Sequence, residues 1–206
     1  MTIEWVHVLA FNATLLAAIA SPGPSLPFLT RTAMAEGCTA GLAAAVGLGI
    51  MASLWTLAAL LGLDALFSLF PWAYTAVKMG GAAYLIWIAF QTWRNARAPL
   101  GTAPQVSKGR AFRQGMLVNL ANPKSVLFSA AVIVVIFPEG LTTADKALIY
   151  LNHLGVELVV QPLLAVALST AIVRTRYLSA KSIFDRIAAG VLVALGLRLL
   201  FERGTP

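Results

Sequence analysis

The longest uncharged stretches of this chain most constrain its fold. No Asp, Glu, Lys or Arg occurs between Glu4 and Arg31, and none occurs between Glu36 and Asp64. A helix of about 20 apolar residues crosses the hydrocarbon core of a bilayer. Only 11% of the 206 residues are charged, whereas soluble domains carry about 25%. The sequence therefore predicts an all-α integral membrane protein.

Six apolar segments are long enough to be predicted as transmembrane helices. They run over about 5–29, 39–63, 71–93, 111–137, 147–173 and 183–201. The stretch 96–108 is rich in Pro, Gly, Thr and Ser, which is typical of a linker. We therefore treat 1–206 as a single transmembrane domain with two halves, about 1–95 and 109–206.

The positive charge of the chain is concentrated in two expected loops. The formal net charge is +7 and the pI is near 10.1. One acid, Asp185, accompanies the basic residues of these loops, which are Arg94, Arg97, Lys108, Arg110, Arg113, Arg174, Arg176, Lys181 and Arg186. Lys and Arg concentrate in cytoplasmic loops and face anionic lipid. We therefore predict a bacterial-type inner-membrane protein with both termini outside, and no nucleic-acid partner.

The first and fourth segments align when the chain is shifted by 101 residues. Ala10-Phe11 then falls on Ala111-Phe112, and Ile19-Ala20-Ser21-Pro22 falls on Leu120-Ala121-Asn122-Pro123. Each half holds three predicted spans, and an odd number of spans reverses the orientation. The chain is therefore predicted to contain two inverted three-helix repeats. Inverted repeats with helices broken at corresponding positions are typical of secondary transporters.

Two of the predicted helices should be broken. The breaks are expected at Ser21-Pro22-Gly23-Pro24 and at Asn122-Pro123-Lys124. Proline removes an amide donor, and the carbonyl groups that it frees must be satisfied or must line a cavity in the protein. A lone charge at membrane depth usually faces the bundle interior. A packing kink with a snorkelling Lys124 is the alternative for one break, but two related breaks favour a binding or gating site.

These motifs resemble those of the LysE/RhtB family of amino-acid exporters. The resemblance rests on Pro22-Gly23-Pro24, on Asn122-Pro123-Lys124 and on Lys78 followed by Gly81-Ala82-Ala83-Tyr84-Leu85, and it covers nearly the whole chain. It implies export of amino acids or small related metabolites from the cytoplasm, coupled to the proton motive force. Ala52 and Trp55 stand where members commonly carry an acidic residue or glycine and a histidine, which leaves the substrate class open.

The roles of four charged or amide residues decide the extent of the predicted site. Lys124 can pair with a substrate carboxylate, whereas Glu157 can bind the ammonium, carry a proton or form a structural ion pair with Lys124 or Lys78. Lys78 either lines the path or snorkels to the surface. Asn119 lies three residues before Asn122 on the same helix face. It therefore either extends the site or bonds a neighbouring helix.

Other polar residues are expected to have structural roles. Asn12 and Gln161 are predicted to form hydrogen bonds between helices. His153 is expected near the outer end of the fifth segment, outside the site. Trp5, Trp72 and Trp93 fit interfacial belts.

The sequence contains few features that would indicate a protein class other than a transporter. It has one cysteine, Cys38, and no His-Glu-x-x-His, Gly-x-Ser-x-Gly or phosphate-loop motif. We therefore expect no metal, no cofactor and no enzymatic activity. An intramembrane enzyme and a non-transporting membrane scaffold remain the alternatives. Abundant small residues make a homodimer plausible.

Overall fold

The computed structural model describes residues 3–20, 23–70, 72–97 and 110–201, and over these ranges it contains helices and no strands. The predicted all-α class is therefore confirmed. The helices are α1 (Trp5–Ala20), α2 (Ser25–Ala35), α3 (Cys38–Leu69), α4 (Trp72–Arg94), α5 (Ala111–Leu120), α6 (Pro123–Ile136), α7 (Thr143–Ser169) and α8 (Ala171–Phe201).

Both predicted helix breaks are present. The first apolar segment forms α1 and α2, whose axes differ by 58°, and the fourth forms α5 and α6, which differ by 61°. Two single helices, α3 and α7, are long and apolar enough to cross a membrane, and each bent pair also qualifies if it counts as one span. Because α4 and α8 do not qualify by these criteria, six spans in two inverted repeats stay a prediction.

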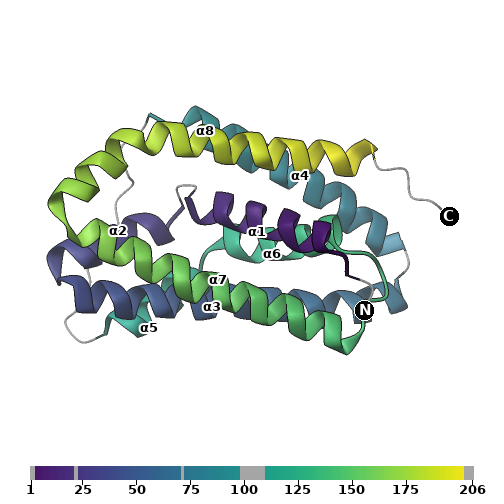
Figure 1. Cartoon of the computed structure of the whole chain (residues 1–206). Coiled ribbons are helices and arrows are strands. Elements are labelled where there is room, and N and C mark those ends of the chain that lie inside the picture. The colour runs from purple at the N-terminus through teal and green to yellow at the C-terminus, as the bar shows by residue number, and fades with distance from the viewer. Residues whose placement is uncertain (1–2, 21–22, 71, 98–109, 202–206) are drawn as a thin grey trace.

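The helices form two outer layers, and further helices lie between these layers (Figure 1). One layer is the antiparallel pair α4 and α8, and the other contains α3 and α7, with α5 packed on α3. Helices α1 and α6 lie between the layers, where α1 contacts α8 and α6 contacts α4. One helix of each broken pair therefore lies at the centre of the bundle.

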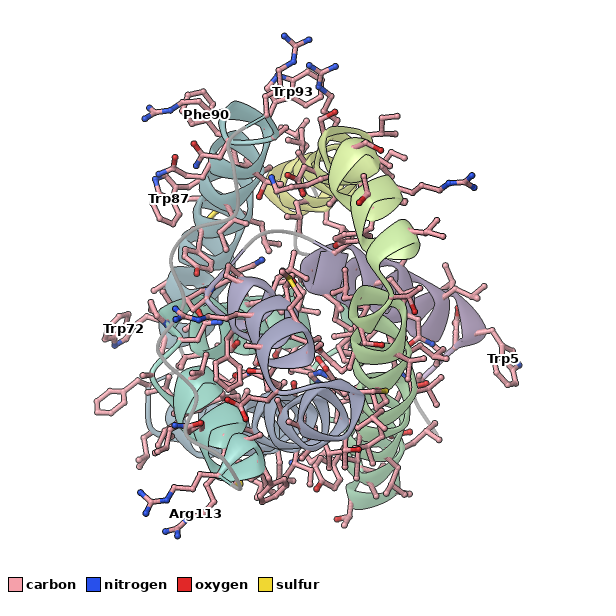
Figure 2. All side chains as sticks on the ribbon, turned by 90° about the vertical axis from the view of Figure 1, so that its left-hand side faces the viewer. Trp5, Trp72, Trp87, Phe90, Trp93 and Arg113 are labelled. Carbon is pink, nitrogen blue, oxygen red and sulfur yellow. The ribbon has the colours of Figure 1, made fainter. Side chains whose placement is uncertain are left out.

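The close packing of α3 on α5 depends on two glycines. A Cβ atom on Gly47 would overlap the carbonyl oxygen of Phe112, and one on Gly115 would overlap that of Ala44. Small residues allow helices to approach closely where lipid supplies no hydrophobic driving force between them. The exterior is apolar as well, as exposed side chains such as Trp72, Trp87 and Phe90 show (Figure 2).

Our prediction of a loop before the sixth segment is wrong, because the residues assigned to this loop belong to α8, which begins at Ala171. Lys181 and Asp185 form a buried ion pair at 2.7 Å between Nζ and Oδ2, with the i, i+4 spacing that a helix allows. The same ammonium lies 3.4 and 3.5 Å from the carbonyl oxygens of Asn95 and Ala96, at the end of α4. This pair therefore joins α8 to α4 and is not a loop charge.

The arginines that flank the predicted linker and those in the first turns of α8 still gather at one end of the molecule. α1 begins and α8 finishes at the opposite end (Figure 1). The exposed members of the arginine-rich end include Arg94, Arg97, Arg110, Arg113 and Arg176, and Figure 2 views this end directly. Most of the predicted linker 96–108 lies outside the described residues.

Candidate functional site

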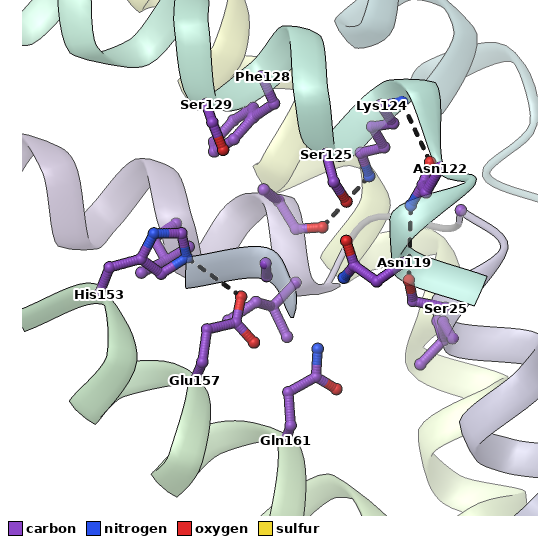
Figure 3. Close-up of a pocket in the computed structure, with 16 residues that line it drawn as sticks. Ser25, Asn119, Asn122, Lys124, Ser125, Phe128, Ser129, His153, Glu157 and Gln161 are labelled. Carbon is purple, nitrogen blue, oxygen red and sulfur yellow. Dashed lines mark hydrogen bonds and ion pairs between the residues drawn. The ribbon is translucent and has the colours of Figure 1, made fainter. Parts of the chain in front are cut away.

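Residues beside the two helix breaks contact one another (Figure 3). Asn122 caps α6: its side-chain oxygen accepts a hydrogen bond from the backbone nitrogen of Lys124 at 3.1 Å, and Pro123 occupies the first turn. Its Nδ2 lies 3.5 Å from Oγ of Ser25, at the start of α2. Lys124 Nζ donates to the carbonyl oxygen of Ala18 at 3.2 Å, near the end of α1. Elements far apart in sequence therefore form one polar site.

A cavity of about 60 Å³, here called the inner cavity, lies beside these contacts. It has room for about four water molecules. Six helices, α1, α2, α3, α5, α6 and α7, contribute to its wall. Its polar lining residues are Ser25, Asn119, Asn122, Lys124, Ser125, Ser129, His153, Glu157 and Gln161.

Two buried oxygen atoms of this lining have no hydrogen-bond partner among the described residues. They are Oε2 of Glu157 and Oδ1 of Asn119. The Asn119 amide is held in place because its Nδ2 donates to the carbonyl oxygen of Leu48 at 3.1 Å. A buried acceptor without a donor costs free energy, so each such group in a protein needs an explanation. A ligand that donates hydrogen bonds supplies one.

His153 belongs to the site, and our placement of it at the outer end of its segment was wrong. It is 2% exposed and lines the inner cavity. Its Nδ1 lies 2.7 Å from Oγ1 of Thr56, which in turn contacts Oγ of Ser129 at 3.2 Å. Its Nε2 lies 3.4 Å from Oε1 of Glu157. The sequence signal was the four-residue spacing of His153, Glu157 and Gln161, which places all three on one helix face.

A second cavity of about 290 Å³, here called the outer cavity, lies on the other side of Lys124. Gly23, Asn122 and Lys124 line both cavities. The rest of its wall comes from the C-terminal half of α4 and from two prolines of the breaks. These residues are Pro24, Tyr84, Trp87, Ile88, Gln91, Thr92, Asn95 and Pro123.

The predicted site residues are thus mostly together. Asn119 and Glu157 line the inner cavity, and Pro24 and Pro123 line the outer one. Ser21 and Pro22 lie outside the described residues. Lys78 lies in α4, but its side chain is outside the described part of the structure.

Two residues with expected structural roles have different outcomes. Asn12 forms the predicted bonds between helices, through two amide contacts with Asn152 at 2.7 and 3.3 Å. Gln161, which we expected to bond a neighbouring helix, lines the inner cavity. Over the described ranges, no cluster of three His, Cys, Asp or Glu side chains is placed to hold a metal ion.

Comparison with known proteins identifies the family. Residues 16–203 match the family model of the LysE type translocator. The chain belongs to this family. The predicted family is therefore confirmed, and the chain is a membrane protein of the translocator type.

Two relatives of this LysE type translocator have informative names. The threonine efflux protein of Escherichia coli K12 is 29% identical over 213 aligned positions, which cover 98% of each chain. The homoserine/homoserine lactone efflux protein of Salmonella typhimurium is 36% identical over 162 positions, which cover 78% of this chain and 76% of the relative. No solved structure matches the chain.

Proposed function

We propose that this translocator exports amino acids or closely related small metabolites from the cytoplasm. The observation that carries the proposal is the pair of unpartnered acceptors, Oε2 of Glu157 and Oδ1 of Asn119, in a cavity that also contains the Lys124 ammonium. An amino acid presents an ammonium and a carboxylate. The two acceptors would bind the ammonium, and Lys124 would exchange its bond to the Ala18 carbonyl for the carboxylate.

The names of the relatives suggest the first substrates to test. They are threonine and homoserine, which carry a side-chain hydroxyl group. The inner cavity has serine hydroxyls at Ser25, Ser125 and Ser129. These can donate to or accept from a hydroxyl on the substrate.

The charge distribution supports an inner-membrane orientation with the arginine-rich end in the cytoplasm. Helices α2 and α5 have 11 and 10 residues, so each reaches about 15 Å from this end towards its break. The hydrocarbon core is about 30 Å thick, which puts the breaks near its midplane. We infer six spans in two inverted repeats, with both termini outside and lipid around the apolar exterior. A homodimer remains part of this proposal.

Proton coupling would use the His153–Glu157 pair. Its Glu157 Oε1 faces His153, and its Oε2 is available to the cavity, so one carboxylate serves a proton site and a substrate site. A proton that arrives from outside neutralises this carboxylate and weakens its hold on the substrate ammonium. Loss of the proton to the cytoplasm restores the ammonium site. Thr56, Ser129, Asn119, Gln161 and Lys124 are the other polar groups around this pair.

Export can be measured as uptake into inverted membrane vesicles. Labelled threonine and homoserine should accumulate, and a proton gradient that is acid inside should increase the accumulation. Vesicles with Lys124→Ala at equal abundance provide the matched control. If neither these two nor any other amino acid tested accumulates above that control, the exporter proposal fails.

A further inference from the structure

We propose that the outer cavity is a second substrate site, which receives an amino acid from the cytoplasm and passes its carboxylate to the inner cavity through Lys124. This inference rests on the proposed export function and adds to it a binding site at which the substrate enters. The outer cavity adjoins the last turns of α4, which ends at Arg94 in the arginine-rich end. It therefore lies between that end and the inner cavity.

The lining of the outer cavity suits a zwitterion. Lys124 carries the only formal charge among the described residues that line it. It can therefore attract a carboxylate. Tyr84 and Trp87 stack with ring centroids 5.8 Å apart, and aromatic faces attract ammonium groups. Gln91 and Asn95 add amide groups that can donate and accept hydrogen bonds.

The Lys124 side chain can reach both cavities, because it lines each of them. Its backbone is fixed by the Asn122 cap at the start of α6, while its side chain has a flexible four-carbon stem. The stem lies over Gly23: a Cβ atom there would be 3.4 Å from Cδ and 3.8 Å from Nζ of Lys124. The wall between the cavities is thus thin where Lys124 crosses it. A carboxylate held by Nζ can pass from one cavity to the other as the stem changes rotamer.

The kinetic test compares two tryptophans of α4 with nearly equal exposure. Trp87 is 55% exposed and lines the outer cavity, whereas Trp93 is 57% exposed and is not part of its lining. Trp87→Ala should raise the half-saturating concentration of threonine or homoserine in inverted vesicles by about tenfold. The maximum rate should stay within about twofold, because the inner site is intact. Equal effects of Trp87→Ala and Trp93→Ala would overturn the inference.

A labelling test does not depend on transport. The single cysteine allows a cysteine-free background with Cys38→Ser. Gln91→Cys in this background should react with a membrane-impermeant thiol reagent in inverted vesicles but not in right-side-out vesicles, and saturating threonine or homoserine should slow the reaction. Asn95→Cys is the second variant for this test, for use if the Gln91→Cys protein does not reach the membrane. Arg113→Cys, exposed at the same end, should react without protection.

The outcomes separate the two proposals. Protection of Gln91→Cys together with absent export would retain the outer site and reject export. Export without protection at Gln91→Cys or Asn95→Cys would reject the outer site and retain export. Reaction from the external side alone would contradict the cytoplasmic position of the cavity.

Discussion

The Nε2 atom of His153 lies 3.4 Å from Oε1 of Glu157, one helical turn further along α7. The other carboxylate oxygen is buried without a hydrogen-bond partner in the described part of the chain. In the proposed mechanism, one oxygen faces the proton carrier His153 and the other binds the ligand. Because both belong to one carboxylate, events at the two oxygens are electrostatically linked.

Glu157→Gln should reduce gradient-driven export of threonine or homoserine at least about tenfold, since a neutral amide binds an ammonium more weakly than a carboxylate does. The measurement is uptake into inverted vesicles at equal protein abundance. Glu139→Gln, which changes an exposed acid outside both cavities, is the matched control. Full activity in Glu157→Gln would contradict the ammonium site.

His153→Gln should separate export from the proton gradient. The amide keeps hydrogen-bonding capacity towards Thr56 and Glu157 but cannot carry a proton at neutral pH. Exchange of labelled for unlabelled substrate should persist within about threefold of wild type, while stimulation by an acid-inside gradient should disappear. A variant that still responds fully to the gradient would remove His153 from the coupling mechanism.

Lys124→Ala should abolish export without loss of membrane abundance, because it removes the proposed carboxylate ligand from both cavities. Lys124→Arg should keep part of the activity, since it retains the charge but not the shape. Lys146→Ala, on α7 outside both cavities, serves as the control. A drop in abundance of Lys124→Ala would indicate a structural role instead, and wild-type export by the variant would contradict the proposed carboxylate ligand.

Gly47→Ala should destabilise the protein by about 1–3 kcal/mol, because the added methyl group overlaps the Phe112 carbonyl and forces α3 from α5. Thermal unfolding in detergent measures the effect as a lowered Tm. Gly62→Ala provides a control in the same helix, since a Cβ there meets nothing within 4 Å. Equal Tm values for the two variants would show that the close approach of α3 and α5 is not required.

Asp185→Ala should destabilise the protein by about 3–5 kcal/mol, because it leaves the buried Lys181 ammonium without its carboxylate. The double variant Lys181→Met/Asp185→Leu should recover most of this loss, since it removes both buried charges. Tm of the single and double variants gives the comparison. If the double variant is as unstable as the single one, the bonds of Lys181 to the α4 carbonyls matter more than the ion pair.

The sequence predicted the helix breaks because proline and glycine act on the backbone locally. It also predicted that Asn122 and Lys124 belong to the site, because a polar break in an apolar helix must face other protein groups. The contact between Lys124 and Ala18 is different, since it depends on how the two bent pairs pack. No local pattern contains that information.

Two misplacements have specific physical causes. His153 was placed too near a helix end because α7 begins at Thr143, where Thr142 and Asp145 form a capping box, and not near Ala147. Lys181 and Asp185 were assigned to a loop because charged residues usually lie in water. Their mutual neutralisation and the carbonyl groups of α4 allow both to be buried in α8.

The small volume of the inner cavity has a consequence for selectivity. It has room for about four water molecules, and even the smallest amino acid has more non-hydrogen atoms than that. A substrate would therefore fit only if the helices that line the cavity, such as α1, α6 and α7, moved apart, and the protein would expand with each loading. Hydrostatic pressure should then slow transport, more steeply for bulkier substrates. Discrimination by side-chain size would then depend on how far these lining helices separate, rather than on the shape of a rigid pocket.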